Sequence, residues 1–158
     1  MGIFFDEHQR ILALLIKHQV EFLLIGGYAV IFHGYSRTTG DMDIWLAPDN
    51  KNKLRLINAL SEADFDSADL ETLSTMNFEQ HLVFSLGTKP TKIDFLTKIN
   101  QVVFKDAFSQ KIDADFDGFH VPIINLEDLV LSKFNTGRKK DVADIEALQK
   151  IVKGKKKK

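Results

Sequence analysis

The sequence contains no cysteine, which excludes disulfide bonds, zinc–thiolate sites and catalysis by a thiol. It also has no run of about 18 apolar residues, so we expect no membrane-spanning helix. The start, MGIFFDEHQR, lacks the basic region of a secretion signal and the Ser or Thr that favours myristoylation. These absences together predict a cytoplasmic protein with no membrane partner.

Length and apolar content predict a single domain with its own core. The chain has 158 residues, of which 44% are hydrophobic, including 13 phenylalanines. We place the domain at residues 1–152 and expect residues 153–158, which end in four lysines, to be a disordered tail.

The net charge of −1 hides an asymmetry between the two halves of the chain. Residues 1–80 carry 6 Lys/Arg and 12 Asp/Glu, a net −6, whereas residues 81–158 carry 15 and 10, a net +5. Neither half has the strongly basic composition of a dedicated nucleic-acid binder. Basic residues near 133–140 remain candidates for contacts with phosphate.

Hydrophobic periodicity predicts an α/β (α+β) chain with hairpins rather than a regular βαβ array. Leu54, Ile57 and Leu60 form the expected buried stripe of one helix, and Val142, Ile145, Leu148 and Val152 form that of the last. The polar segment 63–80 has no clear pattern. We expect helices at 6–19, 28–33, 51–62 and 101–108 and from 126 and 138, and strands at 22–25, 41–47, 81–86, 91–96 and on both sides of a turn at 117–118.

Two aspartates on a predicted strand, Asp41 and Asp43, form the first candidate site. The chain has 15 aspartates and four Asp-x-Asp pairs, so the spacing alone indicates little. The other pairs lie in a polar segment (64/66) or lead into an Asp-Gly turn (113/115 and 115/117). Only Asp41 and Asp43 project to one side of a strand whose opposite face is apolar. Like charges held there are costly unless a cation joins them, so the pair predicts a metal site.

A glycine pair, Gly26-Gly27, follows the apolar run 22–25 and allows two interpretations. A strand-to-helix turn often needs glycine for its backbone angles. Alternatively, the missing side chains let phosphate oxygens reach backbone N–H groups at the start of the next helix. The pair is neither a Walker A loop nor a G-x-G-x-x-G fingerprint, because the other residues of both motifs are absent.

Asp94 is the third carboxylate of interest, because it stands inside the strand-like run 92–96. Taken alone, it is more typical of an exposed strand position. If its strand pairs beside 41–47, Asp94 completes a site of three carboxylates.

In this order, Gly26-Gly27, Arg37, Asp41/Asp43 and Asp94 resemble the DNA polymerase beta nucleotidyltransferase superfamily. Its pattern is Gly-Gly or Gly-Ser, then Asp-x-Asp or Asp-x-Glu, then a later carboxylate on a strand. The resemblance implies the nucleotidyltransferase fold, a short, mixed, twisted sheet flanked by helices.

Residues 33–39 are similar to a segment of small AbiEii-type (toxin-related) nucleotidyltransferase-like proteins, which carry His-Gly-x-x-Arg-x-Thr before the aspartates. Many of those toxins have Gly-Ser where this chain has Gly-Gly, and this chain leaves little room for their extra C-terminal helical domain. The similarity covers most of residues 20–150. Their downstream Lys, Arg-x-Lys-Asp and further Asp correspond here to Lys133, Arg138, Lys140, Asp141 and Asp144.

The resemblance implies magnesium-dependent transfer of a nucleotidyl group from a nucleoside triphosphate to a hydroxyl. Asp41 and Asp43 would bind two Mg²⁺ ions, one also held by Asp94, which is the candidate base. The acceptor could be RNA, protein or a small molecule, and a cognate protein partner and a toxin–antitoxin or defence role are implied as well. The implied nucleotide-binding residues are Gly26, Gly27, Arg37, Thr39, Lys133, Arg138 and Lys140.

Several side chains keep two interpretations. Lys133 faces inward and either extends its charged end to solvent or contacts a phosphate. Arg138 and Lys140 stand at the N-terminus of a helix, where the helix dipole is also positive. This placement favours a nearby anion, which is either Asp141 and Asp144 or a bound ligand. Trp45 either stacks on a base or packs at the edge of the core.

Two other functions also fit the residues. One is a non-catalytic binding module, or one subunit of a two-component system, although all three carboxylates are retained. The other is a metal-dependent phosphoesterase with water as the nucleophile, although the histidines that such sites commonly add are missing.

Overall fold

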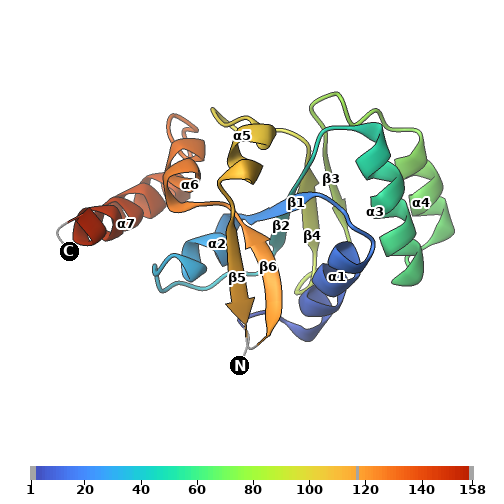
Figure 1. Ribbon diagram of the computed structural model, residues 1–158, viewed down its shortest axis with the longest axis horizontal. Coiled ribbons are helices and arrows are strands. Elements are labelled where there is room, and N and C mark those ends of the chain that lie inside the picture. The colour runs from blue at the N-terminus through green and yellow to red at the C-terminus, as the bar shows by residue number, and fades with distance from the viewer. Residues whose placement is uncertain (1–2, 117, 157–158) are drawn as a thin grey trace.

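The computed structural model describes residues 3–116 and 118–156, and within them six strands form one mixed sheet (Figure 1). Their order is β3-β4-β2-β1-β6-β5. The β2–β4 and β1–β6 pairs are parallel and the other three are antiparallel. The fold class expected from the sequence is therefore confirmed. The strands are β1 (Phe22–Ile25), β2 (Met42–Leu46), β3 (Val83–Leu86), β4 (Ile93–Leu96), β5 (Ile112–Phe116) and β6 (Phe119–Ile123).

Helices cover the sheet in two groups. α1 packs on α3 and α3 on α4, whereas α6 packs on α7 at the other side of the molecule (Figure 1). No helix in the described residues is both long enough and apolar enough to cross a membrane. The helices are α1 (Asp6–Lys17), α2 (Gly26–Phe32), α3 (Asn50–Glu62), α4 (Ser67–Ser74), α5 (Phe104–Ser109), α6 (Leu126–Ser132) and α7 (Lys139–Lys156).

The centre of the sheet is fully apolar on β1 and nearly so on β2. All four residues of β1 are buried, and in β2 only Asp43 is not fully buried. β2 lies between β1 and β4, so Asp43 pairs with Ile25 on one side and with Asp94 on the other. β2, the strand that carries Asp43, is therefore held in place by a paired strand on each side.

Two elements differ from the sequence-based expectation. The unassigned segment 63–80 contains α4, whose start is capped by Asp66, the side chain of which accepts a hydrogen bond from the Ala68 N–H. α7 continues through residues 153–156, where we expected disorder; lysine is a good helix former and favours a helix C-terminus. The last two tail residues, 157 and 158, and residue 117 of the expected turn lie outside the described residues.

The expected buried stripes of α3 and α7 are partly wrong. Leu54 and Val142 are exposed, at 59% and 56%. In α3 the predicted Leu60 is buried, and Leu56, which was not predicted, faces the core in place of Leu54. In α7 the buried face includes Asp144, because basic partners elsewhere in the chain neutralise it. A hydrophobic pattern cannot identify a buried face that contains acids.

Leu54 and Leu56 offer a direct test of the α3 orientation. Leu56→Ala removes a fully buried side chain, so it should lower the free energy of unfolding by about 2–5 kcal/mol. Leu54→Ala, two residues away on the exposed face, should change it by less than about 0.5 kcal/mol. Urea denaturation measures both values, and equal losses would show that the helix is rotated from its place here.

Candidate active site

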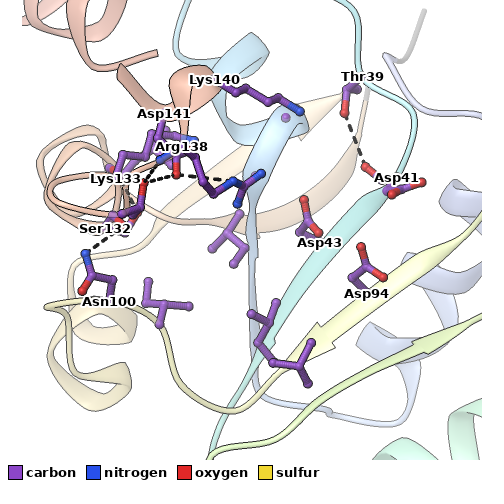
Figure 2. A pocket seen from close by; sticks show the side chains of 18 of the residues that line it. Thr39, Asp41, Asp43, Asp94, Asn100, Ser132, Lys133, Arg138, Lys140 and Asp141 are labelled. Carbon is purple, nitrogen blue, oxygen red and sulfur yellow. Dashed lines mark hydrogen bonds and ion pairs between the residues drawn. The ribbon is translucent and has the colours of Figure 1, made fainter. Parts of the chain in front are cut away.

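Asp43 and Asp94 lie side by side because β2 and β4 pair in parallel with these residues in register. Neighbouring strands are about 4.8 Å apart, so the two carboxylates are forced together. Burial, together with the negative charges of Asp94 and Asp41, raises the pKa of Asp43 to about 7. The expectation that the strand of Asp94 pairs beside 41–47 is confirmed. Figure 2 shows Asp41, Asp43 and Asp94 on one side of a cleft.

Asp41 stands just before β2 and is joined to Asp94 by a lysine. The Lys92 Nζ lies 3.6 Å from Asp41 Oδ2 and 3.5 Å from Asp94 Oδ1. Across the neighbouring β3 strand, the Ser85 hydroxyl donates a hydrogen bond to Asp94 Oδ1. The sequence analysis missed Lys92 and Ser85. Lys92 could have been found, because strand alternation places residues 92 and 94 on the same face.

The glycine pair lets two other side chains approach the backbone. Gly26 has a φ of +67°, a conformation that favours glycine, and a Cβ there would overlap the Asp43 carboxylate. A Cβ on Gly27 would overlap the side chain of Thr39. The turn interpretation is therefore confirmed. Gly26, Gly27 and Thr39 also line the cleft, and the Thr39 hydroxyl lies 3.4 Å from the Asp41 carbonyl oxygen, to which it donates.

A buried ion-pair network holds the opposite side of the cleft. Asp144 is 1% exposed, with Lys133 Nζ at 2.9 Å from its Oδ2 and Arg37 Nε at 3.1 Å from its Oδ1. Lys133 Nζ also lies 3.3 Å from Asp141 Oδ1, and the Thr136 hydroxyl donates to Asp141 Oδ2 at 2.7 Å. The network joins the segment before β2 to α6 and α7.

The network changes the assignment of the predicted phosphate-binding residues. Arg37 binds Asp144 and the Thr38 carbonyl oxygen, and it is not among the described residues that line the cleft. Lys133 lines the cleft, but its ammonium group forms ion pairs with the two carboxylates of Asp141 and Asp144. For Lys133, the snorkelling interpretation is wrong, because its ammonium group is buried among acids.

Arg138 and Lys140 are the basic residues best placed to reach a ligand. The side chain of Arg138 is 67% exposed, and its Nε is 3.8 Å from Asp141 Oδ2. Lys140 is exposed, and its charge lowers the pKa of Asp43 against the larger effects of burial and neighbouring acids. Figure 2 shows both side chains extending from the start of α7 toward the cleft. Of the two kinds of anion expected at the start of α7, the structure contains Asp141 beside Arg138, and a bound ligand stays a prediction.

The cleft between the carboxylates and the α7 cations has a volume of about 1170 Å³. This volume is somewhat larger than that of most small-molecule sites, which measure roughly 300–1,000 Å³. Between the charged walls lie apolar side chains, Ile25, Leu96, Ile99 and Leu129, with Asn100 beside them. Trp45 is not part of this surface: it is 1% exposed and packs edge-on against Phe104, so base stacking is excluded for it.

The carboxylate oxygens are the ligand type that Mg²⁺ prefers, but the three side chains are not arranged around one point. The raised pKa of Asp43 reflects its burial first and then the negative charges of Asp94 and Asp41, which a cation would balance. Yet within residues 3–116 and 118–156 no three Asp, Glu, His or Cys side chains converge closely enough to hold a metal ion. Asp43 and Asp94 are adjacent, whereas Asp41 is tied to Lys92. The three carboxylates therefore suit Mg²⁺ by their chemistry, and their side chains would have to move for all three to bind one ion.

The sheet topology, with carboxylates at the centre and cations across a cleft, places the protein among the nucleotidyltransferase enzymes. The chain belongs to the family described as "Nucleotidyltransferase of unknown function (DUF6036)", whose model matches residues 4–153. The superfamily expected from the sequence is therefore confirmed.

Solved structures share the fold. The lincomycin-bound lincosamide antibiotic adenylyltransferase LnuA superposes with a TM-score of 0.57 at 19% identity, over 96% of this chain and 99% of that one. The antibiotic-resistance factor ANT(2'')-Ia superposes with a TM-score of 0.55 at 12% identity, over 90% of this chain and 80% of that one. No curated protein sequence matches this chain. At these identities the likeness establishes the fold alone.

The Asp144 network predicts a large stability effect far from the metal-site carboxylates. Asp144→Ala leaves Arg37 and Lys133 without their buried counter-charge, so it should lower the free energy of unfolding by about 3–5 kcal/mol. Glu146→Ala, on an exposed turn of the same helix, is the matched control and should cost less than about 0.5 kcal/mol. Denaturant unfolding at neutral pH measures both. A loss below about 1 kcal/mol for Asp144→Ala would contradict the network.

Asp43 should make stability depend on pH in the absence of divalent cations. Its pKa is about 7 in the folded state against 3.8 for a free side chain, so folding favours its protonated form. Its contribution is full below pH 3.8 and is lost as pH rises through 7. Asp43→Asn removes this loss, so the melting-temperature advantage of the variant over wild type should grow between pH 5 and pH 8. Thermal unfolding in EDTA tests this, and a constant difference would contradict the raised pKa.

Proposed function

We propose that the protein transfers a nucleotidyl group from a nucleoside triphosphate to a hydroxyl group, with Mg²⁺ bound by Asp41, Asp43 and Asp94. The observation that carries this proposal is the in-register pairing of Asp43 with Asp94 on parallel central strands, facing the cations of α7 across one cleft. Membership in a nucleotidyltransferase family supports the reaction type.

The triphosphate would lie between the two walls of the cleft. Arg138 and Lys140 extend into this space and would bind phosphate oxygens by charge-assisted hydrogen bonds. Gly26, Gly27 and Thr39 would border the phosphates on the sheet side. Lys133 and Arg37 would act indirectly, because their ion pairs with Asp144 hold the start of α7 in place.

The reaction would be an in-line displacement at the α-phosphorus. The acceptor oxygen forms a bond to this phosphorus as the bond to the bridging oxygen breaks, and pyrophosphate leaves. The carboxylate of Asp94, whose side chain is 22% exposed, is the candidate base that takes the hydroxyl proton. Magnesium, when bound, would supply positive charge that stabilises the phosphate oxygens in the transition state.

The finer assignments also belong to the proposal. Residues 33–39 support a relationship to AbiEii-type proteins and, with it, a role in a toxin–antitoxin or defence system with a cognate partner. A cytoplasmic location would suit a triphosphate substrate. The candidate acceptors are RNA, protein and small molecules, and the transfer assay distinguishes them. LnuA and ANT(2'')-Ia share the fold but not enough sequence to assign their acceptors to this chain.

Asp94→Asn should lower label transfer from α-³²P-labelled triphosphates by about 10²–10⁴-fold, because it removes the proposed base. Asp43→Asn should abolish the increase in triphosphate affinity that Mg²⁺ produces in calorimetry. Asp113→Asn is the matched control, since this aspartate belongs to another Asp-x-Asp pair and its side chain is 68% exposed. It should leave both measurements unchanged.

The transfer assay should include cell RNA, cell protein and small molecules as separate acceptor pools, with each of the four labelled triphosphates. Label in one pool supports the proposal and names the acceptor class. Release of free nucleotide alone would favour a phosphoesterase. If the triphosphate affinity is changed neither by Mg²⁺ nor by Asp43→Asn, a binding module is favoured instead.

A further inference from the structure

Lys92 lies between two of the carboxylates that the proposed metal site would use. Its Nζ lies 3.6 Å from Asp41 and 3.5 Å from Asp94, two of the three proposed magnesium ligands. The negative charges of Asp94 and Asp41 raise the pKa of Lys92. The ammonium group thus does part of the neutralisation that the proposed function assigns to Mg²⁺.

The backbone of Lys92 is held by the sheet, whereas its side chain is partly exposed. Its carbonyl oxygen accepts a hydrogen bond from the Met42 N–H at 3.1 Å, which anchors residue 92 to the start of β2. The side chain is 32% exposed, and among the residues that the structure describes its ammonium group has ion-pair partners only in the two carboxylates. Rotation of this flexible side chain toward solvent would therefore release Asp41 without disturbing the sheet.

The geometry points to Lys92 as a tethered counter-ion that competes with divalent cations for Asp41 and Asp94. This inference rests on the proposed function of the same site. With Lys92 in place, a free Mg²⁺ ion meets two carboxylates that are already partly neutralised, so it binds weakly. A triphosphate brings several negative charges and shifts the balance toward the metal. Metal loading is thereby coupled to nucleotide binding, and Lys92 is a positioning residue rather than a catalytic one.

The test compares divalent cation binding by variants that differ only in charge at position 92. Lys92→Met keeps the length of the side chain and removes its charge, whereas Lys92→Arg keeps the charge. Lys105→Met, at an exposed position of α5, is the matched control for the loss of a lysine. Binding of Mn²⁺ to the nucleotide-free protein is followed by electron paramagnetic resonance, and binding of Mg²⁺ by calorimetry.

Lys92→Met should bind Mn²⁺ at least about tenfold more tightly than wild type without nucleotide, because a competing positive charge is lost. Lys92→Arg and Lys105→Met should resemble wild type. In EDTA, Lys92→Met should melt at a lower temperature than wild type and regain more stability from Mg²⁺. Circular dichroism establishes that each variant is folded.

Two different failures can be told apart. If Lys92→Met binds Mn²⁺ no more tightly, or less tightly, while wild type still binds Mn²⁺ together with a triphosphate, the competition is disproved and the proposed function stands. If neither protein binds Mn²⁺ with or without a triphosphate, the metal site itself is disproved, and the competition with it.

Discussion

The parallel pairing of β2 with β4 is the constraint on which the rest of the site depends. It fixes Asp43 beside Asp94 through backbone hydrogen bonds, although the two carboxylates repel each other. Nearby residues compensate for this charge: the Lys92 ammonium group lies against Asp94 and Asp41, and the Ser85 hydroxyl donates to Asp94. The apolar core around β1 and β2 supplies the stability that holds such an unfavourable pair in place.

The basic side of the cleft is organised in two layers. The inner layer is buried and structural: Lys133 and Arg37 neutralise Asp144 and connect the segment before β2 to α7. The outer layer, Arg138 and Lys140, is exposed and faces the carboxylates (Figure 2). Because the inner cations are committed to protein anions, the outer ones remain for a ligand. One sequence motif of charged residues can therefore contain both binding residues and the ion pairs that position them.

Much of the fold could be predicted because its signals are local. The strand 22–25 was predicted at its observed bounds, and the strand 41–47 extends one residue beyond β2 at each end, because apolar runs and glycine turns mark them. The buried face of α7 could not be predicted, because Asp144 is buried there only through its ion pairs with Lys133 and Arg37. The missed helix α4 has a recognisable cap, Asp66, but little hydrophobic periodicity.

By itself, the sequence determined which residues are candidates: the glycine pair, Asp41 and Asp43 on a central strand, Asp94 on another, and the basic group that opens the last helix. Only the tertiary structure decided which of them meet. Strand pairing brings Asp94 to Asp43 across 51 residues, and a buried ion pair takes Arg37 to Asp144 across 107 residues. The physical reason is that composition and periodicity report how each segment meets solvent, whereas the partner of a charge is set by which distant segments the core packs together.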